Sequence, residues 1–271
     1  MHRGYQIIAV TPAGRRRFLE ILLRHTLTNI TILDEHHLWN NTPDAADIEY
    51  MERVASKHSF FKLVHPTRPL TNRPAQTIYQ FFPYCVEKKT IYIRFDDDIC
   101  YICPKTIEKL VNFRIDNPDP FLVFPIIICN SMEWVLEPFQ PVAQWPKNES
   151  NSILPHIRRH VEFLSEPCSD RYKCSPYTVP ENVHISINCI CWTGEDFAKF
   201  NGIVPPWPVN EETWLTQTKP TELKRPNCIM GDGVVVHFSY SHGRTMHFLE
   251  KHTDLYQRYL ALAKKIRPTL I

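Results

Sequence analysis

Residues 91–102 read IYIRFDDDICYI, an alternating apolar segment that runs into three consecutive carboxylates before apolar residues resume. The alternation predicts a β-strand that ends at Asp96. Three adjacent negative charges repel one another, and a fold that holds them at a strand end usually provides a cation. In open α/β sheets, ligands bind just beyond the carboxyl ends of strands. We therefore expect Asp96, Asp97 and Asp98 to bind a divalent metal and phosphate, with a solvated acidic turn as the alternative.

The rest of the chain alternates between strand and helix patterns. The first half has apolar runs that predict strands at 6–10, 28–33, 60–64, 90–95 and 121–129. Between them, helical spacing predicts helices at 15–26, 44–58 and 73–85 and another that begins at Pro104. This order predicts an α/β fold with a mostly parallel central sheet flanked by helices.

The second half of the chain is less regular. Residues 133–180 are rich in Pro, Ser and Asn, and we expect a long loop there that shapes an acceptor pocket. Later patterns predict strands at 184–192 and 234–240 and helices at 194–200, from Glu211 and at 252–265. We expect one domain over residues 1–271, made of two halves, 1–130 and 131–271.

Composition narrows the function classes. The net charge of +2, from 31 basic and 29 acidic residues, gives no reason to expect a nucleic-acid partner. No apolar run approaches the roughly 20 residues of a membrane span, and the first residues lack the features of a signal peptide. We therefore expect a cytoplasmic protein, in the host cytoplasm if the source is viral. The sequence does not indicate an oligomeric state.

The nine cysteines have no disulfide-scaffold spacing. A CxxC (Cys100–Cys103) and a CxC (Cys189–Cys191) resemble zinc ligands, but both lie in apolar runs where Cys usually acts as a small buried hydrophobe. Cys168 and Cys174 flank a polar loop and are the pair most suited to a bridge.

Asp96 and Asp98 form a DxD pair. In extended backbone, residues two apart project to the same side, so both carboxylates can face one ligand. Hard oxygen donors of this kind suit Mg²⁺ or Mn²⁺.

Three segments taken together resemble a known family. TPAGRRRFLEILL (11–23), IYIRFDDDICYI (91–102) and GDGVVVHFSY (231–240) follow one another as in the GT-A glycosyltransferases, and the chain looks most like the viral (chlorella-virus capsid-glycan) and bacterial members. The resemblance implies a Rossmann-like GT-A fold that binds Mn²⁺ or Mg²⁺. The donor would be a nucleoside diphosphate sugar, most of all a UDP-sugar, bound by residues 1–130. The acceptor would be a glycan or another hydroxyl compound, bound by residues 131–271.

The resemblance also assigns roles on the donor side. At the end of the first strand, the base and ribose of the nucleotide would be lined by Thr11, Pro12 and Ala13. Asp34 would contact the uracil, although a turn cap explains it equally well. Arg15 and Arg73 would reach the diphosphate, although an exposed helix face also accounts for such arginines.

Three residues would bind the metal. On the resemblance, Asp96 faces the ribose and the metal, Asp98 binds the metal, and His237 supplies a further ligand, with Asp97 beside them. A histidine in an apolar strand can also be a hydrogen-bonded core residue, and His242 and Arg244 are alternative phosphate contacts.

The acceptor side carries acidic residues at helix starts. In inverting GT-A enzymes an acidic pair at such a position ends in the base that deprotonates the acceptor, which points to Glu212, with Glu211 next and Asp196 as a further candidate. The family's usual Glu-Asp is Glu-Glu here. Charge complementing a helix dipole is the competing explanation.

Two other functions remain open. A nucleotidyltransferase also combines a Rossmann-like sheet with paired metal carboxylates, but it normally has a glycine-rich loop, and residues 11–17 contain one Gly. A catalytically silent protein that binds metal or a nucleotide sugar would show the same acidic triplet.

Overall fold

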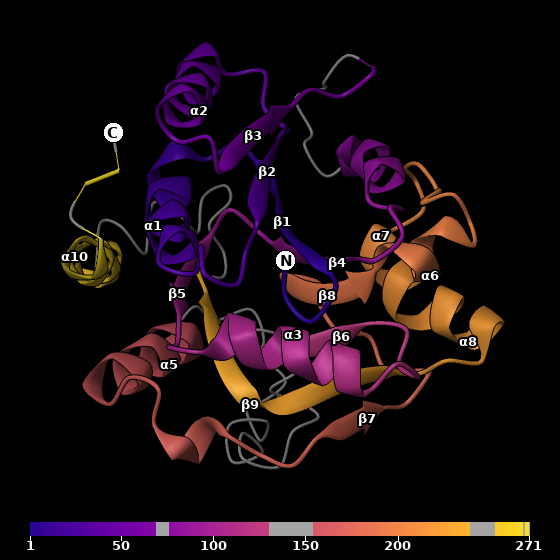
Figure 1. The fold of residues 1–271 in the computed structure, drawn as a ribbon. Coiled ribbons are helices and arrows are strands. Elements are labelled where there is room, and N and C mark those ends of the chain that lie inside the picture. The colour runs from indigo at the N-terminus through magenta and orange to yellow at the C-terminus, as the bar shows by residue number, and fades with distance from the viewer. Residues whose placement is uncertain (69–75, 130–153, 239–252, 268, 271) are drawn as a thin grey trace.

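The computed structural model describes residues 1–68, 76–129, 154–238, 253–267 and 269–270 (Figure 1). A nine-stranded sheet runs through the molecule, and helices flank it. Its strand order is β3-β2-β1-β4-β8-β6-β9-β5, with β7 paired to β9. The predicted α/β fold class is therefore confirmed.

The first four strands in the order are parallel. They are β3 (Phe61–Val64), β2 (Glu35–Asn40), β1 (Gln6–Ala13) and β4 (Thr90–Phe95). The helices α1 (Arg16–Leu27) and α2 (Ala45–Lys57) connect the first three, as the patterns predict. Because parallel strands share a direction, the carboxyl ends of these four strands form one edge of the sheet, here called the site edge.

The other strands make the second half of the sheet mixed. They are β8 (Cys189–Thr193), β6 (Val123–Ile128), β9 (Asn227–His237), β5 (Ile99–Ile102) and β7 (Tyr177–Val179). β8 runs antiparallel to both β4 and β6, whereas β6 and β9 are parallel. Every residue of β4 and β6 is buried, in keeping with their largely apolar sequences. Both halves of the chain thus contribute to one sheet.

Short and long helices complete the fold. Those of the second half and the connections are α3 (Thr106–Asp116), α5 (Leu154–Ser165), α6 (Gly194–Ala198), α7 (Glu211–Thr213), α8 (Lys219–Leu223), α10 (Leu255–Ile266), η2 (Ile78–Tyr84), η6 (Asp170–Tyr172) and η7 (Trp214–Thr218). α5 and β7 lie in the segment 133–180 that the sequence predicts as loop, so that prediction is wrong there, while residues 130–153 lie outside the described residues. None of the described helices has both the length and the apolar character needed to cross a bilayer.

The predicted strand at 28–33 is wrong. Residues 29–32 form turns in which the Asn29 carbonyl accepts from the backbone of Ile32 and Leu33. The true strand, β2, reads EHHLWN, and its buried His36 hydrogen-bonds to the hydroxyls of Thr11 (2.9 Å) and Thr26 (3.1 Å). Because these buried hydrogen bonds satisfy the polar ring, a strand forms where apolar periodicity does not predict it.

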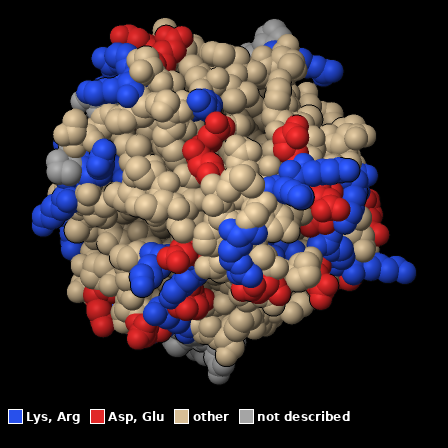
Figure 2. All heavy atoms as spheres, viewed as in Figure 1, with Lys and Arg blue, Asp and Glu red and all other residues tan. Residues whose placement is uncertain are grey.

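The structure also corrects the cysteine pairing. Cys103, which follows β5, forms a disulfide with Cys168, so the predicted pairing of Cys168 with Cys174 is wrong. Cys100 and the Cys189–Cys191 pair are buried free thiols, as the hydrophobic interpretation predicts. On the face drawn in Figure 2, basic and acidic side chains are interspersed rather than gathered by sign.

Candidate metal and donor site

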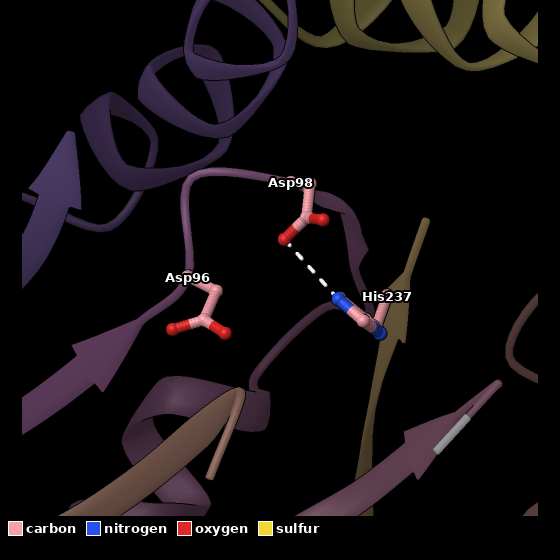
Figure 3. A group of neighbouring side chains, drawn as sticks. All are labelled: Asp96, Asp98 and His237. Carbon is pink, nitrogen blue, oxygen red and sulfur yellow. Dashed lines mark ion pairs between the residues drawn. The ribbon is translucent and has the colours of Figure 1, made fainter. Parts of the chain in front are cut away.

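The acidic triplet lies at the site edge, directly after β4. The backbone turns there, since the Ile99 amide donates to the Asp96 carbonyl (3.1 Å). The extended backbone assumed for the DxD pair is therefore wrong, and the turn itself brings the two carboxylates together. Asp96 and Asp98 converge with His237, and their ligand atoms all lie within 4.8 Å of one another (Figure 3).

His237 is the last residue of β9, which pairs with β5 just beyond the triplet. Its Nε2 lies 3.2 Å from Asp98 Oδ1, and its Nδ1 lies 3.3 Å from the Cys129 carbonyl oxygen. A proton on Nδ1 that is donated to this carbonyl directs Nε2 toward the carboxylates, as in many metal-bound histidines. Burial lowers the pKa of His237, but the Asp98 and Asp96 carboxylates and the Cys129 carbonyl together outweigh burial and raise it.

Arg15 contacts the triplet from the turn between β1 and α1. Its Nη1 donates to Asp98 Oδ2 (2.9 Å) and its Nε to Asp97 Oδ1 (2.8 Å), while the Gly14 amide donates to Asp97 Oδ2 (3.0 Å). Asp97 is 3% exposed, and burial raises its pKa to about 6 against the opposing effect of Arg15. Asp97 thus faces the protein, where it orients Arg15.

The predicted donor residues of β1 reach the site edge. The register pairs Ala13 with Asn40 at the ends of β1 and β2. Pro12 and Ala13 are buried there, and the Thr11 hydroxyl is engaged by His36 inside the fold. Asn41, next to this edge, accepts a hydrogen bond from Thr77 (2.7 Å).

Two residues that are predicted to contact the donor, Asp34 and Arg73, are not placed at the site edge. Asp34 precedes β2 and accepts from the Ile7 amide (2.8 Å), near the start of β1, so it lies at the opposite edge of the sheet. Its expected place beside a base followed from the misplaced strand at 28–33. Arg73 lies outside the described residues, as do His242 and Arg244.

The acidic pair at the start of α7 also lies near the triplet. Asn210 caps this helix through the Thr213 amide (3.1 Å). Glu211 Oε1 accepts from Arg94 Nη1 (3.0 Å), and burial raises the pKa of Glu211 to about 7 against the effect of Arg94. Glu212 is more open, with 29% of its side chain exposed, and its Oε1 accepts from the Ile187 amide (3.1 Å).

Two residues of the site were not predicted. Arg94, in β4, donates to Asp96 as well as to Glu211, and Asn188 Nδ2 donates to Asp96 Oδ2 (2.8 Å). Arg94 is a charge inside a buried strand pattern, which is a usable sequence signal. Asn188 could be found only from the antiparallel register of β8 against β4, which places its neighbour Cys189 beside Phe95.

Asp196 lies away from the triplet. It follows Thr193, which pairs with Ile91 at the beginning of β4, so Asp196 is at the edge opposite the site. Its carboxylate accepts from Thr193 Oγ1 (2.9 Å) and Lys199 Nζ (2.8 Å) and is also paired with Arg225. The structure therefore does not bring this base candidate to the acidic triplet.

The described residues also line a cavity of about 350 Å³ at the far end of α1 from Arg15. It lies between the end of α1 and the start of α3, with His25, Tyr101 and Lys105 among its walls. None of the triplet residues lines it, so the cavity is separate from the candidate metal site.

Comparisons with known proteins concern the fold. Neither the family models nor the curated protein sequences give a match. Among solved structures, the chain is similar to the mannosyltransferase PcManGT from Pyrobaculum calidifontis, in complex with GDP-Man and Mn²⁺, at 13% identity and a TM-score of 0.54. The alignment covers 98% of this chain, which spans 65% of the mannosyltransferase's length. The fold is the GT-A, Rossmann-like α/β fold.

Two further structures share this fold. Glucosyl-3-phosphoglycerate synthase from Mycobacterium tuberculosis, in complex with phosphoglyceric acid, aligns with 97% of this chain and 80% of its own at 15% identity and a TM-score of 0.51. CMP:2-keto-3-deoxy-manno-octonic acid synthetase, complexed with CTP, aligns with 96% of this chain and 99% of its own at 12% identity and a TM-score of 0.50. The likeness therefore concerns the fold, which proteins of different printed activities share.

Proposed function

We propose that this chain is a metal-dependent glycosyltransferase. It would transfer a sugar from a nucleoside diphosphate sugar, for which the sequence resemblance favours UDP, to a hydroxyl of a glycan or another acceptor. The observation that carries the proposal is the convergence of Asp96, Asp98 and His237 at the site edge of a GT-A sheet. The narrower likeness to viral and bacterial enzymes stays a prediction.

The charge balance of the site supports a bound cation. Asp96–Asp98 and Glu211–Glu212 bring five carboxylates together. Among the described residues, the guanidinium groups of Arg15 and Arg94 contact them, and the imidazoles of His184 and His237 lie against Glu212 and Asp98. A divalent ion held by Asp96, Asp98 and His237 would offset this surplus, and Mn²⁺ and Mg²⁺ suit carboxylate oxygens. When bound, such an ion supplies charge neutralisation to a departing diphosphate.

The two halves of the chain would divide the substrates. Residues 1–130 supply the ends of β1 and β2 and the triplet, which suit the nucleotide of the donor. Residues 131–271 supply the acidic pair of α7, which suits the acceptor. Arg15, 28% exposed at its side chain, is positioned at the triplet to contact a phosphate oxygen.

Glu212 is the base in this proposal, because its carboxylate is the more exposed of the pair. It takes the proton of the acceptor hydroxyl as the oxygen attacks the anomeric carbon. The bond from that carbon to the diphosphate oxygen breaks on the opposite face, through an oxocarbenium-like transition state, so the configuration inverts. Positioned bases of this kind contribute roughly 10²–10⁴-fold.

A product assay tests the proposal against the nucleotidyltransferase alternative. The protein is incubated with Mn²⁺ and a panel of UDP- and GDP-sugars, with water or added glycans as the acceptor, and separately with nucleoside triphosphates and sugar phosphates. We expect release of the nucleoside diphosphate from the first panel. Pyrophosphate release from the second panel would favour the nucleotidyltransferase, and binding of Mn²⁺ and UDP without turnover of either panel would favour a silent binding protein.

The cytoplasmic location stays a prediction that the disulfide makes testable. Disulfides persist mainly in oxidising compartments. The free thiols are counted in protein taken from its own cells and denatured without added thiol. Seven free thiols, with the Cys103–Cys168 bridge intact, would favour an oxidising compartment. Nine free thiols would favour the cytoplasm.

A further inference from the structure

Arg94 occupies an unusual position for a charged residue. It lies within β4, where all residues are buried, and only 3% of it is exposed. Arg94 lies near the carboxyl end of β4, two residues before Asp96, which directly follows the strand. A β-branched apolar residue would suit a buried strand better, because desolvating a guanidinium is costly.

The guanidinium of Arg94 joins two parts of the site. Its Nε and Nη2 donate to Asp96 Oδ1 at 3.1 and 2.9 Å, and its Nη1 donates to Glu211 Oε1 at 3.0 Å. These acids are 115 residues apart in the sequence and come from the end of β4 and the start of α7. The planar fork therefore fixes the carboxylate of a candidate metal ligand relative to the acidic pair.

Asn188 completes the support of Asp96 from the other side. Its Nδ2 donates to Asp96 Oδ2 (2.8 Å), and its carbonyl accepts from the Asp96 amide (2.8 Å). Hydrogen bonds to both oxygens restrict rotation of this carboxylate. Partners of this kind orient metal ligands, and their loss typically costs 10–100-fold in metal affinity or activity.

We propose that Arg94 is a positioning residue that couples the metal site to the acceptor base, by holding Asp96 and the Glu211–Glu212 pair at one fixed separation. The inference rests on the proposed function. Lysine cannot replace Arg94 fully, because one ammonium lacks the rigid fork that reaches both carboxylates.

The test compares Arg94→Met and Arg94→Lys with a matched control, Arg114→Met, which removes another buried arginine from α3, away from the site. Mn²⁺ affinity is measured by the electron paramagnetic resonance of the free ion, a readout that requires no turnover. Hydrolysis of UDP-glucose and GDP-mannose is followed in parallel. Folding of each variant is checked by thermal unfolding.

We expect Arg94→Met to weaken Mn²⁺ binding and lower kcat, each by about 10–100-fold, and Arg94→Lys to lose less of both. Added guanidinium chloride at millimolar concentration should restore part of the kcat of Arg94→Met. Arg114→Met should keep the wild-type values per folded molecule. If Arg94→Met does not fold, the Arg94→Lys comparison and its lower Mn²⁺ affinity decide the question.

Three results would overturn the coupling role. They are wild-type Mn²⁺ affinity and kcat, within two-fold, in a folded Arg94 variant; equal losses in Arg114→Met; and a wild-type protein that binds no Mn²⁺. A wild-type protein that binds Mn²⁺ but hydrolyses neither sugar nucleotide counts against the proposed function instead, and the Mn²⁺ affinities still test the contact between Arg94 and Asp96.

Discussion

Two acidic sites lie at opposite ends of β8, and they differ in how their charge is balanced. Asp196, beyond one end, is paired with Lys199 and Arg225, and although burial raises its pKa, hydrogen bonds from these partners outweigh burial and lower it. At the other end, where Asn188 contacts Asp96, burial raises the pKa of Asp97 to about 6. In the part of the chain that the structure describes, two cations contact the single Asp196 carboxylate, whereas the guanidinium groups of Arg15 and Arg94 are shared among Asp96, Asp97, Asp98 and Glu211.

The largest expected effect is a difference in activity between substitutions at the two ends of β8. Asp98→Asn should lower metal-dependent release of the nucleoside diphosphate by roughly 10³-fold, because Lewis-acid stabilisation is worth several kcal/mol. Asp196→Asn should leave activity per folded molecule unchanged. Steady-state assays at saturating Mn²⁺ compare the two, and an Asp98→Asn variant with full activity would falsify the metal role of the triplet.

Within the site, substitutions of Glu211 and Glu212 test which of the two carboxylates is the base. Glu212→Gln should lower kcat by about 10²-fold or more while leaving the donor KM nearly unchanged, because the base acts on the acceptor. Glu211→Gln keeps a hydrogen-bonding group beside Arg94 and serves as the matched variant. Should Glu211→Gln prove the more damaging to kcat at an unchanged Mn²⁺ affinity, the base would be Glu211.

Bound Mn²⁺ should stabilise the folded protein, and this stabilisation should depend on the acidic triplet. At 100 times its Kd, Mn²⁺ should add about 2.7 kcal/mol to the free energy of unfolding, a rise of roughly 5 to 10 °C in Tm for a chain of this size. Thermal unfolding with and without Mn²⁺ measures it. The rise should persist in Asp196→Asn and vanish in Asp98→Asn; an equal rise in both would place the ion elsewhere.

The smallest expected effect concerns Asp196 itself. Asp196→Asn should reduce the free energy of unfolding by about 2 kcal/mol, since it weakens hydrogen bonds to Arg225 and Lys199 that involve charged groups. Urea unfolding measures the loss. A variant as stable as the wild type would show that these partners do not stabilise the fold through Asp196.

The sequence predicts the site best where local pattern and charge agree. The strand before Asp96 and the helix after Arg15 follow from periodicity, and these two elements and the helix that begins at Glu211 stand where they are predicted. Asp34 was misplaced because β2 carries histidines whose buried hydrogen bonds only the fold reveals. Asn188 depends on an antiparallel register that no local pattern encodes.

Anomalous diffraction from crystals soaked with MnCl₂ and UDP tests the central claim most directly. The account predicts a manganese peak within bonding distance of Asp96, Asp98 and His237 Nε2, with the diphosphate on its open side. A peak elsewhere, or none at saturating Mn²⁺, would contradict it.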